Sequence, residues 1–85
     1  MKVIYKYELL IADNQKVELS EDFEILTVQN QDGKLVMWVL IDPDMPECKV
    51  NVNIIGTGNP IYNSSVGEYI STVQMGMFVW HVFIG

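Results

Sequence analysis

The stretch that decides the fold spans residues 24–42 and reads EILTVQNQDGKLVMWVLID. Two runs rich in β-branched and large apolar residues flank Asp32-Gly33. This arrangement predicts a β-hairpin, because glycine adopts positive φ without a steric clash. The second run, residues 35–41, is apolar at every position. A strand of this kind needs cover on both faces, so we expect it at the centre of a sheet.

The rest of the chain continues the β pattern. Valine and isoleucine supply twenty of the 85 residues, whereas alanine occurs once, and β-branched side chains favour strands over helices. Alternation of apolar and polar residues predicts about seven strands, at residues 3–11, 15–19, 25–29, 35–41, 48–55, 68–75 and 77–84. We therefore predict one all-β domain over residues 1–85, a small antiparallel sandwich or barrel.

Composition excludes several classes of protein. With 49% hydrophobic residues the chain is globular, and its length leaves no room for a second domain. A single cysteine, Cys48, cannot form an intrachain disulfide. Five lysines, no arginine and a formal charge of −6 disfavour nucleic-acid binding. We expect a reducing compartment and no membrane segment.

Two of the predicted strands, residues 35–41 and 77–84, are apolar on both faces. These two strands supply more apolar surface than a two-layer domain of this size needs to bury. We expect the surplus to be buried between copies of the chain, in a homo-oligomer.

The turn Gly56-Thr57-Gly58-Asn59 is the first candidate for ligand binding. Glycines around a threonine allow backbone amides to converge on an anion, as in a phosphate-binding nest. The alternative is a tight turn that ends a strand. Tyr62 follows the turn and is available to stack on a planar ligand.

His81 is the only histidine, so any histidine-dependent nucleophilic mechanism would have to use it. It lies in an apolar run, where a hydrogen-bonded structural role is the expected one. One His and one Cys cannot form a zinc site in a single chain. We therefore expect no catalytic residue, no metal and no cofactor, and include His81 among the ligand-binding candidates.

Acidic residues form two clusters in the sequence. A patch of carboxylates that follows the charge spacing of a nucleic acid would fit a basic groove on a partner protein; the alternative is a solvated rim. The candidates for partner binding are Glu18, Glu21, Asp22 and Glu24 in the first cluster, and Asp44 and Glu47, beside Asp42, in the second.

Several stretches together resemble a family of small phage- and prophage-encoded proteins of unknown function. The most specific are GTGNPI at residues 56–61 and VWHVF at 79–83. The resemblance implies a phage accessory protein that acts in the cytoplasm of the host bacterium, and it implies no reaction. The family pattern has histidine where this chain has Asn59, and a binding role tolerates this change better than a catalytic one.

These observations predict a non-enzymatic binding protein. It would inhibit a host component, such as one of an antiviral defence system, by binding a host protein or by sequestering a small phosphorylated signal. The alternatives are a small hydrolase or nucleotide-cleaving enzyme that uses His81 with carboxylates of another subunit, and a minor structural protein of the virion.

Overall fold

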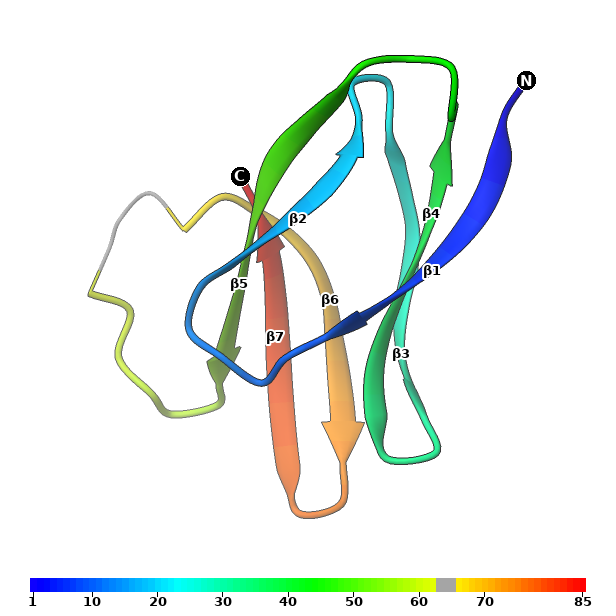
Figure 1. Ribbon diagram of the computed structural model, residues 1–85. Coiled ribbons are helices and arrows are strands. Elements are labelled where there is room, and N and C mark those ends of the chain that lie inside the picture. The colour runs from blue at the N-terminus through cyan, green and yellow to red at the C-terminus, as the bar shows by residue number, and fades with distance from the viewer. Residues whose placement is uncertain (63–65) are drawn as a thin grey trace.

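The computed structural model describes residues 1–62 and 66–85, and this part of the chain forms seven strands and no helix (Figure 1). The all-β prediction is confirmed. Residues 63–65, within the loop predicted between the fifth and sixth strands, lie outside the described residues. The strands are β1 (Val3–Leu9), β2 (Gln15–Ser20), β3 (Glu24–Gln31), β4 (Lys34–Ile41), β5 (Glu47–Gly56), β6 (Glu68–Met75) and β7 (Phe78–Ile84).

The strands form two antiparallel sheets, with the orders β1-β4-β3 and β2-β5-β7-β6. The strands predicted to be covered on both faces, β4 and β7, are each central in their sheet. β3 and β6 lie side by side (Figure 1), and the Asn30 side chain donates to the backbone oxygen of Gln74 over 3.3 Å. The two sheets therefore meet along this edge.

The core lies between the sheets and follows the period of two in each strand. Alternate residues are buried in β5 and, from Met37 onward, in β4; Met37, Val39 and Val52 have no measurable exposure. The alternation predicted for residues 48–55 is confirmed: Val50, Val52 and Ile54 are buried.

The predicted hairpin is formed by β3 and β4. Asp32 and Gly33 both have positive φ, 52° and 81°, as a two-residue type I′ turn requires. The side-chain oxygen of Asn30 accepts a hydrogen bond from the Gly33 amide over 2.9 Å and supports the turn.

Most predicted strand ends differ from the observed ones by one or two residues, and in two strands the prediction extends too far. The first strand ends at Leu9, and Ile11 is exposed. The Gln15 side chain bonds both the amide and the carbonyl of Leu10, which ends the ladder there. The last strand begins at Phe78, because Met75 pairs with Phe78 across a two-residue turn that contains Met77.

Candidate functional site

His81 lies on the outer face of the four-stranded sheet, half-buried among hydroxyl groups. Its Nε2 is 2.6 Å from the Thr57 hydroxyl, and its Nδ1 is 3.0 Å from the Thr72 hydroxyl. The Tyr69 hydroxyl is 2.7 Å from that of Thr72 and extends the chain of hydrogen bonds. The sequence places His81 beside apolar residues, but the fold brings the Thr57 hydroxyl to it from the turn after β5 and the Thr72 hydroxyl from the neighbouring strand β6.

This chain of hydrogen bonds differs from a nucleophilic triad in its third member. In a triad the histidine contacts one hydroxyl and is oriented by a carboxylate. Here each ring nitrogen of His81 is within hydrogen-bond distance of a threonine hydroxyl. The arrangement ties strands together, as the expected structural role requires.

The turn after β5 has its own internal hydrogen bonds. The Asn59 amide donates to the Gly56 carbonyl over 3.0 Å, and the Thr57 amide donates to the Val79 carbonyl over 3.1 Å. Gly58 has a φ of 86°, which is the conformation of the third residue of a type II turn. Two of the amides that an anion nest would use are therefore already engaged.

Gly56 itself is a packing residue. A Cβ at this position would lie 3.1 Å from the Trp80 ring and 2.8 Å from the side-chain nitrogen of Asn59. Glycine is thus used at the start of the turn for close approach of an indole ring.

A pocket of about 440 Å³ lies beside this turn, within the usual size range for small ligands. Two predicted ligand residues line it, Asn59 and Tyr62, although the Tyr62 side chain is 93% exposed. Asn53 in its wall is engaged with Asn14 and with the Val66 carbonyl. Among the described residues that line the pocket, Asp13 is the one with a formal charge. Its negative charge would repel a phosphate group.

The two acidic clusters of the sequence meet at one end of the molecule. The turn between β2 and β3 lies against the loop between β4 and β5 (Figure 1), and the Glu21 amide donates to the Pro46 carbonyl over 2.9 Å. The buried hydroxyl of Ser20 donates to Asp22 over 2.9 Å and accepts from the Asp42 amide over 3.1 Å. Hydrogen bonds of the Glu21 backbone and of the Ser20 side chain therefore hold the clusters together.

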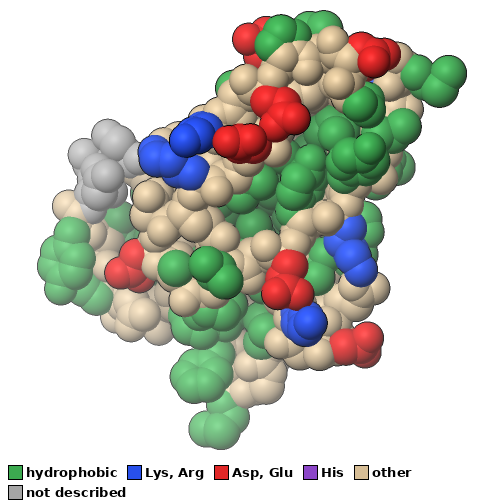
Figure 2. All heavy atoms as spheres, viewed as in Figure 1, with side chains coloured by type: hydrophobic (Ala, Val, Ile, Leu, Met, Phe, Trp, Pro, Cys, Tyr) green, Lys and Arg blue, Asp and Glu red, His purple; other side chains and the backbone are tan. Residues whose placement is uncertain are grey.

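We call this surface the acidic end. Figure 2 shows red carboxylates beside hydrophobic side chains in the upper part of the molecule. The amino group of Met1 is 3.5 Å from Asp42 and 3.8 Å from Asp44, and Lys49 lies opposite Glu18 in the strand register. The acidic end comprises Glu18, Glu21, Asp22, Glu24, Asp42, Asp44 and Glu47.

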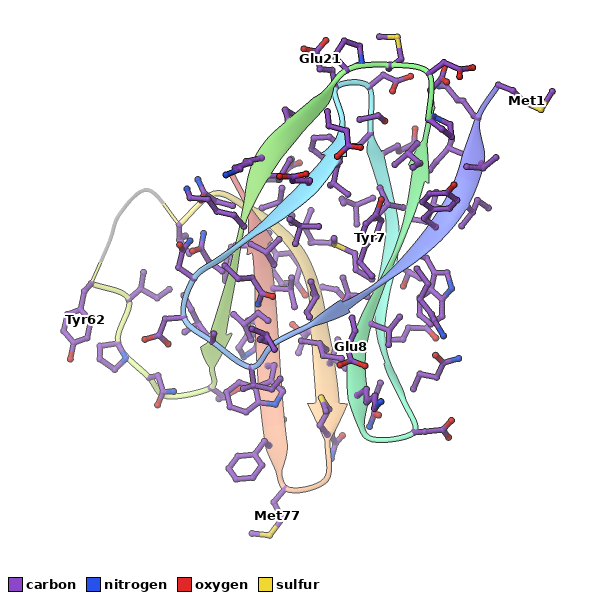
Figure 3. All side chains as sticks on the ribbon, viewed as in Figure 1. Met1, Tyr7, Glu8, Glu21, Tyr62 and Met77 are labelled. Atoms are coloured by element: carbon purple, nitrogen blue, oxygen red, sulfur yellow. The ribbon has the colours of Figure 1, made fainter. Side chains whose placement is uncertain are left out.

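A cleft of about 220 Å³ opens between β1 and β2, on the flank of the acidic end. Sequence reasoning missed it, because its walls come from strands of different sheets. Tyr7, labelled in Figure 3, is one of the residues that line it. Burial raises the pKa of the Tyr7 hydroxyl, and the negative charge of Glu47 and the neighbouring Tyr5 raise it further. The cleft is lined by Tyr5, Tyr7, Glu18, Ser20, Ile41, Asp42, Pro43, Met45 and Glu47.

Comparison with known families gives a match over residues 1–85 to a family described as Domain of unknown function (DUF7352). The chain belongs to this family. No curated protein and no solved structure matches the chain.

Within residues 1–62 and 66–85 of this DUF7352 domain, no group of three or more His, Cys, Asp or Glu side chains is placed to hold a metal ion. The same residues contain no helix long and apolar enough to cross a membrane. Of the predicted ligand residues, Thr57 contacts His81, whereas Asn59 and Tyr62 line the pocket. His81 does not line the pocket, but Ile55, which lies opposite it in the β5-β7 register, does. The predicted partner-binding residues all lie in or beside the acidic end.

Proposed function

We propose that this protein is a non-enzymatic binding module that captures a basic surface of a host protein through the acidic end. The observation that carries the proposal is the meeting of two acidic clusters, separate in the sequence, on one surface supported by the Glu21–Pro46 and Ser20 hydrogen bonds. Carboxylates held in fixed positions attract and orient a basic partner more effectively than scattered ones.

Sequestering of a small phosphorylated signal has less support. The pocket beside the glycine turn carries Asp13, and the amides of Thr57 and Asn59 donate within the protein. A phosphate group needs donors and positive charge from its site. The hydrolase alternative is also weaker, because threonine hydroxyls hold both ring nitrogens of His81.

The setting that we propose follows the resemblance to phage- and prophage-encoded proteins. It is the cytoplasm of an infected bacterium, where capture of a host protein, such as a defence component, inhibits it. The acidic surface suits this role, because charge attraction speeds the encounter with a basic target.

The test compares two variants with the same change in net charge. The first neutralises the acidic end with Glu21→Gln, Asp22→Asn, Glu24→Gln and Asp44→Asn. The control neutralises acids elsewhere with Glu8→Gln, Asp13→Asn, Asp32→Asn and Glu68→Gln. Circular dichroism spectra and thermal unfolding curves that match those of the parent chain would show that both variants retain the fold.

Each protein is recovered from infected cells, and co-purifying host proteins are quantified by mass spectrometry at low and high salt. Four surface charges at roughly 0.2–1 kcal/mol each predict that the first variant recovers about tenfold less of one host protein than the control. High salt should have the same effect on the parent chain. Equal recovery by both variants would mean that net charge, not the acidic end, controls capture, and would overturn the proposal.

A further inference from the structure

The cleft between β1 and β2 combines aromatic rings with carboxylates. Tyr5 and Tyr7 come from β1, Glu18 from β2 and Glu47 from the start of β5. The charged side chains that line it are those of Glu18, Asp42 and Glu47, and all three are acidic. The electrostatic potential of this cleft therefore favours a cation.

The size of the cleft limits what enters it. Its volume of about 220 Å³ is below the roughly 300–1,000 Å³ of most small-molecule pockets. It is suited to one long side chain. The apolar groups of Ile41, Pro43 and Met45 in its wall can pack against the methylene groups of such a side chain.

A guanidinium group matches the polar part of the cleft. Arginine stacks on aromatic rings more often than lysine does, and its planar group donates to carboxylates in pairs. Tyr5 is 49% exposed and does not belong to the core cluster, so its ring is accessible from solvent. Glu18 and Glu47 supply carboxylates on the opposite wall.

The position of the cleft points to a protein segment as the source of this side chain. β1 is an edge strand of its sheet, and an edge presents backbone groups to which an extended segment can bind. Beyond the cleft such a segment would meet the other carboxylates of the acidic end.

We infer that the cleft between β1 and β2 is the docking site for one arginine side chain of a basic segment in the partner protein. This inference rests on the proposed function, because it names the group that the acidic end recognises. The remaining carboxylates then attract the segment, while the cleft selects its arginine.

The test uses two nine-residue peptides of glycine and serine, one with a central arginine and one with citrulline, its neutral isostere. Binding is followed by backbone amide shifts of the isotope-labelled protein. We expect the arginine peptide to shift Tyr5, Tyr7, Glu18 and Glu47 and to bind at least about fivefold more tightly than the citrulline peptide. Equal affinities, or shifts centred on residues 21–24, would overturn the inference.

Variants separate the cleft from general charge. Tyr5→Ala and Glu47→Gln should each weaken binding of the arginine peptide by about fivefold. The matched controls, Tyr62→Ala and Glu68→Gln, change the same residue types at exposed positions outside the cleft, and should leave binding unchanged. Tyr7→Phe keeps the ring that packs on the core and should retain at least half of the affinity; a larger loss would contradict recognition by the ring face.

The two proposals fail in different ways. If Tyr5→Ala recovers the host protein as well as the parent chain, while the four-acid variant does not, then the cleft is not the docking site and the acidic end still captures the partner. If the arginine peptide binds in the cleft but the four-acid variant recovers the host protein unchanged, then the proposed function is wrong.

Discussion

Tyr7 shows how one side chain serves both the core and the cleft. Its ring packs against the buried cluster between the sheets, and its hydroxyl faces a surface that also contains Tyr5, Glu18, Asp42 and Glu47. Burial and the charge of Glu47 oppose ionisation of the hydroxyl and raise its pKa. The neutral form is therefore the one that the folded protein favours.

The raised pKa of Tyr7 predicts a loss of stability in alkaline solution. A group whose pKa is raised by folding stabilises the protein fully below its unfolded pKa, and this contribution disappears as the pH rises through the folded pKa. The free energy of unfolding should therefore decrease above about pH 10. Tyr7→Phe should show a smaller decrease, measured by urea unfolding at neutral and alkaline pH. An identical pH dependence in both proteins would contradict the shift.

At the scale of elements, His81 connects three parts of the chain. β7 carries the histidine, β6 carries Thr72, and Thr57 directly follows β5. These hydrogen bonds cross the outer face of the sheet, where the apolar core contributes least. The histidine thus adds polar cross-links between neighbouring strands.

Removal of these cross-links should lower stability by a measurable amount. Two hydrogen bonds at roughly 0.5–1.5 kcal/mol each predict that His81→Leu costs about 1–3 kcal/mol in the free energy of unfolding. His81→Gln, whose amide can still contact one threonine, should cost less. Thr57→Val in the His81→Leu background should cause little further loss of stability, because the Thr57–His81 hydrogen bond is already lost. Full additivity of the two substitutions would argue against the cross-link.

At the scale of the whole molecule, the outer face of the β1-β4-β3 sheet is apolar along its centre. Trp38 and Leu40 of β4 are half-buried there, and Ile4 beside them is 58% exposed. Val36 continues this face and is buried, although it lies outside the main core cluster. This surface contains the surplus apolar residues predicted in residues 35–41, whereas β7 lies in the other sheet.

We continue to predict that copies of the chain associate through this face. Light scattering at low micromolar concentration and moderate salt should give a mass of at least two chains, and Ile4→Thr with Leu40→Thr should reduce it to one. Phe78→Ser, at the exposed turn between β6 and β7, is the control and should keep the larger mass. A parent chain with the mass of a single copy would exclude the oligomer.

Much of the fold was predictable from local patterns. The Asp32-Gly33 turn follows from two residues that tolerate positive φ, and the central place of β4 follows from its apolar residues on both faces. The end of β1 was not predictable in this way. It depends on the Gln15 side chain, which bonds the backbone of Leu10 across a turn.

The candidate sites were less predictable than the strands. Sequence reasoning identified the acidic residues individually, but their union depends on the pairing of Ser20 with Glu47 in the β2-β5 ladder. It also selected Asn59 and Tyr62, which share a pocket, and His81, which does not line that pocket. The cleft between β1 and β2 was not predictable, because its walls come from segments far apart in the sequence.

The amino-acid sequence by itself determined that this chain forms strands, where the β3-β4 hairpin turns, and that β4 is central in its sheet, because these features depend on neighbouring residues. Only the tertiary structure decided that two acidic clusters form one surface, that hydroxyl groups surround His81, and that tyrosines face carboxylates across a cleft. The physical reason is that these contacts join residues far apart in the chain, and sheet order and register alone bring them together.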